Sequence, residues 1–454
     1  MSSIWWIRRD LRLQDNLTMQ KALEYPPVLP VFILDPLLVE KASDRRMNFL
    51  YSNLKSLHED LVARGSKLII RSGKPVEILE SLLQESGADR IFAEEDFTPY
   101  ARLRNVLVGS YLPLKLVQGQ LGIHPLGVLK ANDKPYRVFT PFKRNWMALA
   151  PTIRLHPAPE QIPTIENIIS EQIPSGREET QFPPGEEYAK QRLEKFLKKK
   201  MDFYHLNRDR MDLDGTSDLS PYIRFGILGL RTALFHGLKL LNSNEGRQDI
   251  LGIDTWLGEL IWREFHINIM YHFPESRTQN FRSMYDKLKW RNDPLDFQAW
   301  KEGRTGFPIV DAGMRQLIQT GWMHNRARMI TASFLVKDLL IDWRWGEQWF
   351  RDCLLDGDLA VNIGSWQWVA GTGTDAAPFF RIFNPVRQSK KFDTNGNYIR
   401  RWVPELAHLD NDLIHAPRGK KAKNINYPEP VVDHKFARER AIIAFQVAKE
   451  KKRL

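Results

Sequence analysis

The chain has 454 residues, 43% of them hydrophobic and 27% charged, as is ordinary for a globular protein of two or three domains. No apolar run approaches the roughly 20 residues that span a bilayer, and charge begins too early for a secretory signal, so we expect a cytoplasmic protein. The single cysteine, Cys353, excludes an intrachain disulfide and a cysteine-based metal finger. A net charge of +11 favours a polyanionic partner, nucleic acid first.

The first part of the chain alternates between strands and helices. Apolar runs of strand length fall at Ile4–Ile7, Val28–Leu34, Lys67–Ile70, Arg90–Ala93 and Leu114–Val117. Segments with helical spacing lie between several of them, for example Arg46–Ala63 and Pro75–Ser86. This alternation predicts an α/β domain with a five-stranded parallel, Rossmann-like sheet. Because no Gly-x-Gly-x-x-Gly follows the first strand, an ordinary dinucleotide site is unsupported there.

The rest of the chain is predicted to be helical. Prolines interrupt residues 131–195, which indicates a connection between domains. Helical spacing of apolar residues then occurs at Glu186–Lys199, Ile223–Leu241, Ile250–Tyr271, Ile309–Thr320 and Arg326–Leu340. We therefore expect an α/β domain at 1–130, a linker at 131–195 and an all-α domain at 196–454.

Eleven of the 14 tryptophans lie between Trp256 and Trp402. Indole rings fill cores, but they also stack on planar ligands, so this density leaves an aromatic core and a cofactor site equally open. Within the same region, Glu259, Trp262 and Arg263 share a helix face by their spacing. A carboxylate beside an indole on an apolar helix is costly to bury without a purpose, although a half-exposed ion pair is the simpler alternative.

Three further segments carry polar groups at informative spacings. In Gly215–Pro221, Ser220 is expected to cap a helix that begins at Pro221, and the hydroxyls there could cradle a phosphate or serve only as caps. In Trp322–Met329, Asn325 and Met329 share a face, whereas Arg326 and Arg328 point to different sides.

Two acidic residues are candidate inward partners for one of these arginines. They are Asp356 and Asp358, and because no third hard ligand is near, we expect no metal site. Asn362, four residues before Trp366, could reach a ligand ring or cap a helix.

Taken together, these motifs resemble the photolyase/cryptochrome family. The matching segments are Trp6–Asn16, Gly215–Pro221, Trp256–Phe265, Thr305–Ala312 and Gly321–Leu406. The resemblance implies FAD in the helical domain, with Arg328 paired to Asp356 and Asn362 facing the flavin N5. By position, the residues that line the FAD site would be Tyr204, Thr216, Ser217, Leu219, Ser220, Trp256, Arg263, Asn325, Arg328, Asp356, Asp358 and Asn362.

Within the family, the pair Asn325 and Met329 resembles the class I-type cyclobutane pyrimidine dimer photolyases. The (6-4) photolyases have a histidine-rich segment here, whereas this chain has only His324. The resemblance implies light-dependent repair of dimers in double- or single-stranded DNA. A blue-light-sensing cryptochrome and a (6-4) photolyase are the alternatives.

The resemblance also assigns roles in repair. A flipped-out dimer would stack on Trp262 and Trp368, Glu259 would hydrogen-bond the thymine edge, and Asn325 and Met329 would contact the lesion. Two arginines, Arg326 and Arg381, would hold the DNA backbone.

Chemistry in this family starts with light: excited FADH⁻ gives an electron to the dimer, the ring splits, and the electron returns. Oxidised flavin would be reduced through a relay of Trp366, Trp343 and Trp290.

A second, light-harvesting chromophore is also expected. Folate-binding members often carry an Asn-Glu pair where this chain has Tyr100 and Ala101, which favours deazaflavin over folate and leaves a flavin possible. Arg45 or Arg46 would be a contact. We expect a monomer that associates with the nucleoid through damaged DNA and has no membrane partner.

Overall fold

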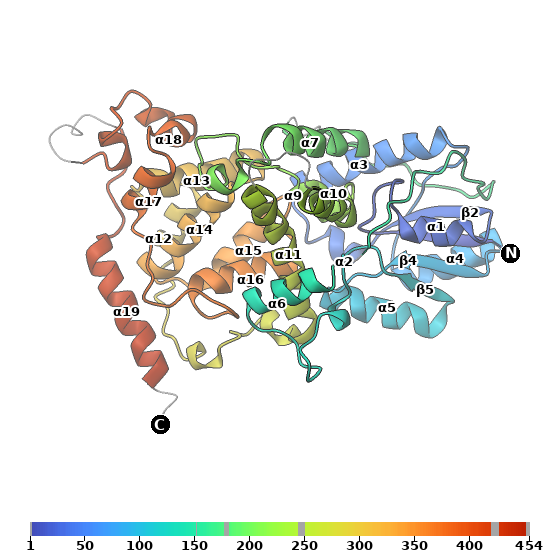
Figure 1. Ribbon diagram of the computed structural model, residues 1–454, viewed down its shortest axis with the longest axis horizontal. Helices are drawn as coiled ribbons and strands as arrows, with labels where there is room; N and C mark the ends of the chain where they lie inside the picture. The colour runs from blue at the N-terminus through green and yellow to red at the C-terminus, as the bar shows by residue number, and fades with distance from the viewer. Residues whose placement is uncertain (1, 151, 177–180, 244–249, 419–425, 451–454) are drawn as a thin grey trace. The chain divides into compact units, whose positions relative to one another are not determined.

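The computed structural model describes residues 2–150, 152–176, 181–243, 250–418 and 426–450. Contacts divide the chain into two compact units, and Figure 1 labels many of their elements. Unit 1 comprises Met1–Asp202 with Ser217–His272, and unit 2 comprises Phe203–Thr216 with Phe273–Leu454. The expected domain boundaries near residues 130 and 195 stay a prediction.

Unit 1 is built on a five-stranded parallel sheet with the strand order β3-β2-β1-β4-β5. The strands are β1 Ser3–Ile7, β2 Val28–Leu34, β3 Ile69–Ser72, β4 Arg90–Glu94 and β5 Leu114–Val117. The predicted sheet is confirmed, and only β3 is displaced, by two residues. It begins later because the Leu68 N–H donates to His58 Nδ1 at 3.3 Å instead of joining the sheet.

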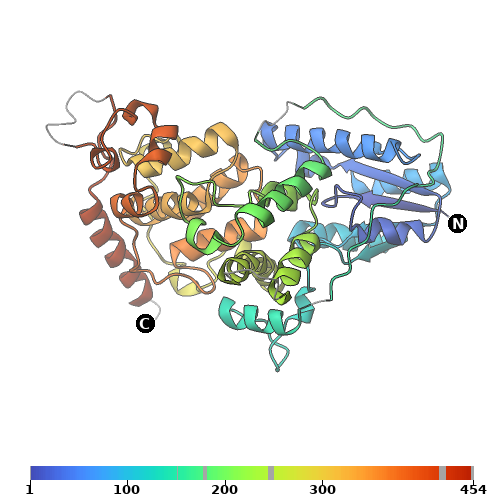
Figure 2. The same cartoon turned by 45° about the horizontal axis from the view of Figure 1, so that its top comes forward.

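Helices cover both faces of this sheet (Figures 1 and 2). Ile4 and Trp6 of β1 belong to the core that α4 (Pro75–Ser86) and α5 (Pro99–Tyr111) complete. Helix α1 (Leu17–Leu23) packs on β1 and β4. Because both faces are covered, every residue of β1 and β2 is buried, which explains the continuous apolar runs in the sequence.

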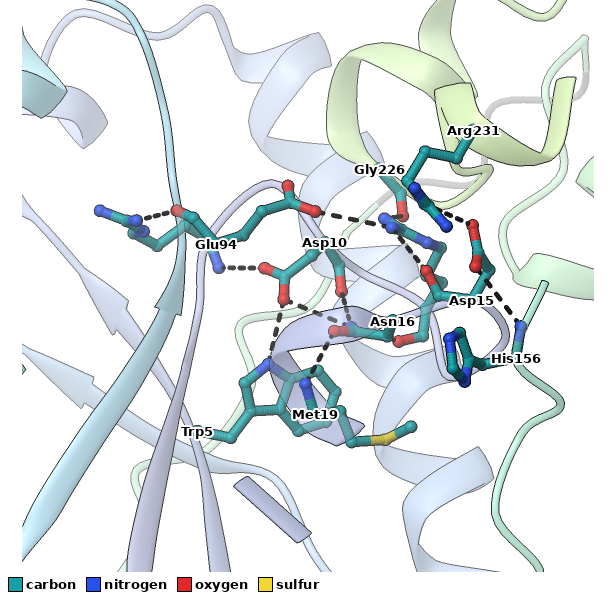
Figure 3. Close-up of polar contacts among 11 residues, drawn as sticks. Trp5, Asp10, Asp15, Asn16, Met19, Glu94, His156, Gly226 and Arg231 are labelled. Atoms are coloured by element: carbon teal, nitrogen blue, oxygen red, sulfur yellow. Dashed lines mark hydrogen bonds and ion pairs between the residues drawn. The ribbon is translucent and has the colours of Figure 1, made fainter. Parts of the chain in front are cut away.

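The segment that follows β1 forms a buried polar network (Figure 3). Asp10 accepts hydrogen bonds from the Trp5 indole at 3.0 Å and from the Arg8 backbone at 2.9 Å. The Asn16 amide donates to the Asp10 and Arg12 carbonyls, while Asn16 Oδ1 caps α1. All of these residues except Trp5 lie in the matching segment Trp6–Asn16, and the network fixes the first sheet-to-helix turn.

The same motif holds the turn between helices α9 (Ser220–Phe225) and α10 (Leu230–Asn242). Arg12 donates to the Gly226 carbonyl at 3.1 Å, and its other terminal nitrogen lies 3.5 Å from Glu94. Gly226 has φ +67, and a Cβ there would lie 1.7 Å from the Arg9 carbonyl. The single helix expected at Ile223–Leu241 is therefore wrong, because the left-handed Gly226 ends one helix and a new one starts at Leu230.

The remaining helices of unit 1 include the expected Glu186–Lys199 and the long helix expected at Ile250–Tyr271. They are α2 Pro36–Val39, α3 Asp44–Val62, α6 Phe139–Ala148, α7 Glu186–Lys199 and α11 Ile250–His272, with a 3-10 turn at Pro125–Gly127. In α11, the Glu264 carboxylate accepts hydrogen bonds from Gly122 N and the Trp146 indole, which anchors a loop to the helix. Burial raises the pKa of Glu264 to about 7.

Unit 2 is helical in its described residues. Its helices are α8 Tyr204–Asn207, α12 Pro294–Lys301, α13 Pro308–Thr320, α14 Asn325–Ser333, α15 Trp343–Cys353, α16 Leu359–Ala370, α17 Pro385–Phe392, α18 Asn397–Trp402 and α19 His434–Glu450, with short 3-10 turns. The helix expected at Arg326–Leu340 continues from α14 into a π-helical turn at Phe334–Asp338. In the described parts of the chain, no helix is long and apolar enough to cross a membrane.

Candidate functional site

Helix α11 of unit 1 carries the polar helix face that the sequence predicts. Glu259, Trp262 and Arg263 are all partly exposed, as their spacing predicts for one side of a helix. Trp256 differs, because it is 2% exposed and packs on Phe196 with ring centroids 5.3 Å apart. The exposed edge of α11 can therefore meet a ligand through a carboxylate, an indole and a guanidinium.

The hydroxyl-bearing segment Gly215–Pro221 does not cap α9 in the way that the sequence predicts. The helix begins at Ser220, its N-cap is Leu219, and no cap side chain bonds to the first turn. The preceding Asp218 has φ +52, so the chain turns before the residue expected to cap. Ser220 is exposed and Leu219 is buried, while Thr216 and Ser217 are half-buried. The predicted cap at Ser220 is wrong by one residue, and the role of the hydroxyls toward a phosphate stays a prediction.

In unit 2, Arg328 pairs with Asp356, as expected. Its two terminal nitrogens donate to the two carboxylate oxygens at 3.1 and 2.8 Å. Arg328 Nε donates to the Met323 carbonyl at 2.8 Å, so the guanidinium is fixed on three sides. Asp358 has another role: it caps α16 by accepting from Ala360 N at 3.2 Å. Among the described residues, no group of three or more potential ligands gathers around a metal-sized site.

Asn362 lies inside α16, so it is not a helix cap. Its side-chain nitrogen donates to the Glu347 carbonyl at 3.0 Å and to Glu347 Oε1 at 2.9 Å. Burial raises the pKa of Glu347. With both amide protons directed at Glu347, the Asn362 oxygen is the atom available to a ligand donor. Glu347 was missed by the sequence analysis, since it is 15 residues away and on another helix.

The start of α14 carries the pair expected to contact a lesion. Asn325 Nδ2 lies 3.9 Å from the Met329 sulfur, which confirms that the two side chains share a face. The preceding His324 caps the helix by accepting from Arg326 N at 3.1 Å. Burial lowers the pKa of His324 to about 4, so this ring is neutral at physiological pH. It is therefore unsuited to act there as a proton donor.

The two tryptophans of α16 have different environments. Trp366 is 2% exposed, with Phe350 at 4.9 Å and Trp300 at 6.1 Å between ring centroids. Trp368 is only partly buried. Residues two apart on a helix point to opposite sides, so one indole faces the interior and the other is open to a ligand.

The other two predicted relay residues also belong to unit 2. Trp343 is fully buried at the start of α15, and its indole donates to Asn280 Oδ1 at 2.9 Å. Trp290 is partly buried, edge-on to Phe445 of α19 at 6.1 Å. Exposure thus increases from Trp366 and Trp343 to Trp290.

The two arginines expected to bind DNA are in different states. Arg326 pairs with Asp209 at 2.5 Å and covers the Phe392 ring at 4.3 Å. Arg381 is exposed, and its side chain has no partner among the described residues. Arg381 is therefore better placed than Arg326 to meet a phosphate.

Tyr204, expected near the flavin, is 7% exposed at the start of α8.

A second cluster lies at the carboxyl edge of the unit 1 sheet. Tyr100 donates to Asp35, and Arg104 lies 4.0 Å from the same carboxylate. Arg8 and Arg104 both cover the Trp6 ring, at 4.7 and 4.9 Å. Burial lowers the pKa of Arg104 and of Arg8, the latter to about 9. The Arg104 side chain makes no hydrogen bond within the described residues, so its donors can serve a ligand.

This cluster meets the rule for ligand sites in open α/β sheets. Strand β1 has β2 on one side and β4 on the other, so the strand order reverses there, and ligands bind outside the carboxyl ends at such a point. The sequence analysis named Tyr100 but missed Asp35 and Arg104, which only the fold brings together.

Comparisons with known proteins identify the family of the chain. Residues 3–164 match the family model described as DNA photolyase, and residues 256–447 match the model described as the FAD binding domain of DNA photolyase. A deoxyribodipyrimidine photo-lyase from Agrobacterium fabrum is 39% identical over an alignment of 477 residues, and the alignment covers 98% of this chain and 98% of the relative.

Two solved structures share the whole fold. A bacterial class III photolyase from Agrobacterium tumefaciens has 38% identity and a TM-score of 0.91, over 99% of this chain and 98% of that one. An archaeal photolyase from Sulfolobus tokodaii, which holds two FAD molecules, has 30% identity and a TM-score of 0.83, over 98% of this chain and 100% of that one. The chain belongs to the DNA photolyase family, and it carries that family's FAD-binding domain.

Proposed function

We propose that the protein is a deoxyribodipyrimidine photo-lyase, which repairs cyclobutane pyrimidine dimers in DNA under light. Full-length similarity to a curated photo-lyase supports the activity. The structural observation that supports this function is the contrast between two indoles of α16. Trp366 is buried, whereas Trp368, two residues away, is partly exposed. A sensor without repair has no need of an open indole for a base.

The residues fit reduced FAD. Asn362 offers an acceptor oxygen to an N–H donor such as the reduced flavin N5, while Glu347 holds the amide in that orientation. The Arg328–Asp356 pair would contact the isoalloxazine edge, and the hydroxyls of Thr216, Ser217 and Ser220 would bind the diphosphate. When bound and fully reduced, FAD supplies one electron on absorbing light.

The other proposed FAD contacts are Leu219, Trp256, Arg263, Tyr204, Asn325 and Asp358.

The lesion would be recognised by apolar surfaces and a few polar groups. Trp262 and Trp368 each offer a partly exposed indole on which a flipped base can stack. Glu259 would accept from the thymine edge, and Asn325 with Met329 would contact the dimer. Arg381 would neutralise a phosphate, and Arg326 would do so only after it leaves Asp209.

We propose Trp366, Trp343 and Trp290 as the route by which electrons reach an oxidised flavin. All three belong to unit 2: Trp366 and Trp343 are buried, and Trp290, the last residue of the route, is partly exposed. The indole N–H of Trp343 has a fixed acceptor in Asn280, which holds this ring in place.

The second chromophore would bind at the carboxyl edge of the sheet in unit 1. A planar ring with carbonyl oxygens would accept from Arg104 and lie near Tyr100 and Asp35. We propose a deazaflavin rather than folate because Tyr100 and Ala101 stand where folate-binding members often carry an Asn-Glu pair. A flavin fits the same donors, and the Sulfolobus tokodaii photolyase holds a second FAD. Extraction of the bound chromophore and its absorption spectrum distinguish the three.

Glu347→Leu should lower the reduction potential of the bound flavin. Without its side-chain acceptor, the Asn362 amide keeps only the hydrogen bond to the Glu347 carbonyl, so its oxygen is held less firmly toward an N5–H. Loss of one hydrogen bond worth about 1 kcal/mol corresponds to a shift on the order of 20 mV for two electrons. Glu347→Gln keeps an acceptor oxygen and should stay near wild type. Equal potentials in all three proteins would remove Glu347 from this role.

The proposed substrate is tested with two defined oligonucleotides, one carrying a thymine dimer and one a (6-4) photoproduct. Each is incubated with chemically reduced protein under blue light, and repair is measured by chromatography. We expect repair of the dimer alone. Repair of the (6-4) lesion alone would assign the other photolyase activity, and repair of neither would leave a light sensor.

A further inference from the structure

A small basic hairpin precedes helix α6 in unit 1. Leu129 pairs with Pro135 in an antiparallel bridge, and Lys130 N donates to the Lys134 carbonyl at 2.9 Å. Lys130, Lys134 and Arg137 are exposed, and Asp133 is the one acidic residue between 129 and 138. Figure 2 shows this turn projecting beyond α6 at the foot of the view.

Helix α6 fixes the hairpin to α11. Phe142 packs on Phe265 with centroids 5.2 Å apart, and the Trp146 indole donates to Glu264 at 2.6 Å. Lys143 pairs with Asp254 at 2.8 Å. These three residues of α6 share one face with Phe139, the first residue of the helix, since their spacing is i, i+3, i+4 and i+7.

At the end of this face, the Phe139 ring covers the indole of Trp262. The centroids are 3.7 Å apart and the planes differ by 10°, so the rings lie face to face. An isolated aromatic pair favours an offset or an edge-on geometry, so the anchored helix imposes this arrangement. Both residues are partly exposed. Phe139 therefore covers one face of the indole, and the rings of Phe265 and His266, each with its centroid 5.5 Å away, further fix its orientation.

We propose that residues 129–139 form a second DNA-contacting segment beside the lesion. In it, Phe139 positions the indole of Trp262, and Lys130, Lys134 and Arg137 contact phosphates of the flanking strand. This inference rests on the proposed role of Trp262 as a lesion wall. Phosphate contacts set register and salt dependence, whereas the stacked indole reads the lesion, so the two parts of the segment have separable effects.

The phosphate contacts are tested by DNA binding in the dark. Lys130→Ala/Lys134→Ala/Arg137→Ala should weaken binding to dimer-containing and undamaged duplexes by similar factors. The slope of log affinity against log salt should become shallower by about 1 for each phosphate that the variant no longer neutralises. Lys195→Ala/Lys198→Ala/Lys199→Ala, on α7, removes the same charge elsewhere in unit 1 and should keep the wild-type slope. A wild-type slope in the hairpin variant, or an equal change in both variants, would overturn the phosphate contacts.

The positioning role is tested by the ratio of affinities for dimer and undamaged DNA. Phe139→Ala should lower this ratio about tenfold at an unchanged salt slope, and Phe139→Tyr, which preserves the stack, should restore it. Quenching of tryptophan fluorescence by iodide should also increase in the alanine variant, because the face of Trp262 that Phe139 covers becomes accessible. An unchanged ratio in a folded Phe139→Ala protein would overturn this role.

These outcomes are distinct from failure of the proposed function. A wild-type protein that does not prefer dimer-containing DNA would refute the function itself. A wild-type protein that does prefer it, together with variants that bind as it does, would refute only the second segment.

Discussion

Trp366→Phe is expected to slow photoreduction of the oxidised flavin by about tenfold or more, equivalent to ~1.4 kcal/mol or more in the barrier. The same variant should repair dimers at nearly the wild-type rate once its flavin has been reduced chemically. The reason is that Trp366 faces the interior, in contact with Phe350 and Trp300, and takes no part in holding DNA. Flash absorption of the flavin and a repair assay with dithionite-reduced protein measure the two effects.

Trp368→Ala is the matched control on the same helix. It should leave photoreduction intact and weaken binding to dimer-containing DNA by roughly 1–3 kcal/mol, the usual value of an aromatic–base stack. If the two variants show the same defect, the assignment of one indole to the electron and the other to the lesion is wrong. Thermal unfolding of both proteins accounts for any loss of packing around Trp366.

Asp356→Ala should both destabilise unit 2 and reduce retention of FAD. Removal of the carboxylate leaves the Arg328 guanidinium partly buried without its bidentate partner, which costs about 3 kcal/mol. Replacing both residues, as Arg328→Leu/Asp356→Leu, should recover much of the stability because no charge is left unpaired. It should not recover FAD binding if the pair is part of the site.

The measurement is thermal unfolding with and without added FAD. A ligand that binds the native state raises the melting temperature, so FAD should stabilise the wild type and fail to stabilise the double variant. The Arg315–Glu405 ion pair, also in unit 2 and 2.7 Å long, provides the control. Arg315→Leu/Glu405→Leu should respond to FAD as the wild type does. Stabilisation of the Arg328→Leu/Asp356→Leu protein by FAD would exclude that pair from the site.

Local periodicity was sufficient to predict the elements and the direction of many side chains. The strands could be predicted because a sheet that is covered on both faces requires continuous apolar runs. Helix spacing correctly placed Arg326 and Arg328 on different sides, so that one meets Asp209 and the other Asp356. It also placed Asn325 on the same face as Met329.

The predictions failed where the structure is determined by an unusual backbone conformation or by packing between residues far apart in the sequence. The break at Gly226 depends on its contact with the Arg9 carbonyl, more than 200 residues away, although Gly226 and Gly229, only three residues apart in one helical pattern, were a warning. Asn362 is oriented by Glu347 from another helix, and Trp262 is covered by Phe139 from a segment taken for a linker. No spacing rule relates such pairs, because only the tertiary fold brings them together.

The most direct test of the account is light-dependent removal of dimers from DNA. Chemically reduced protein is incubated with duplex DNA that contains a single thymine dimer, under blue light and in darkness, and the remaining dimers are counted. The account predicts that dimers disappear only in the light and that Glu259→Ala lowers the yield per photon while FAD stays bound. Equal loss in darkness, or no loss under light with FAD bound and fully reduced, would contradict it.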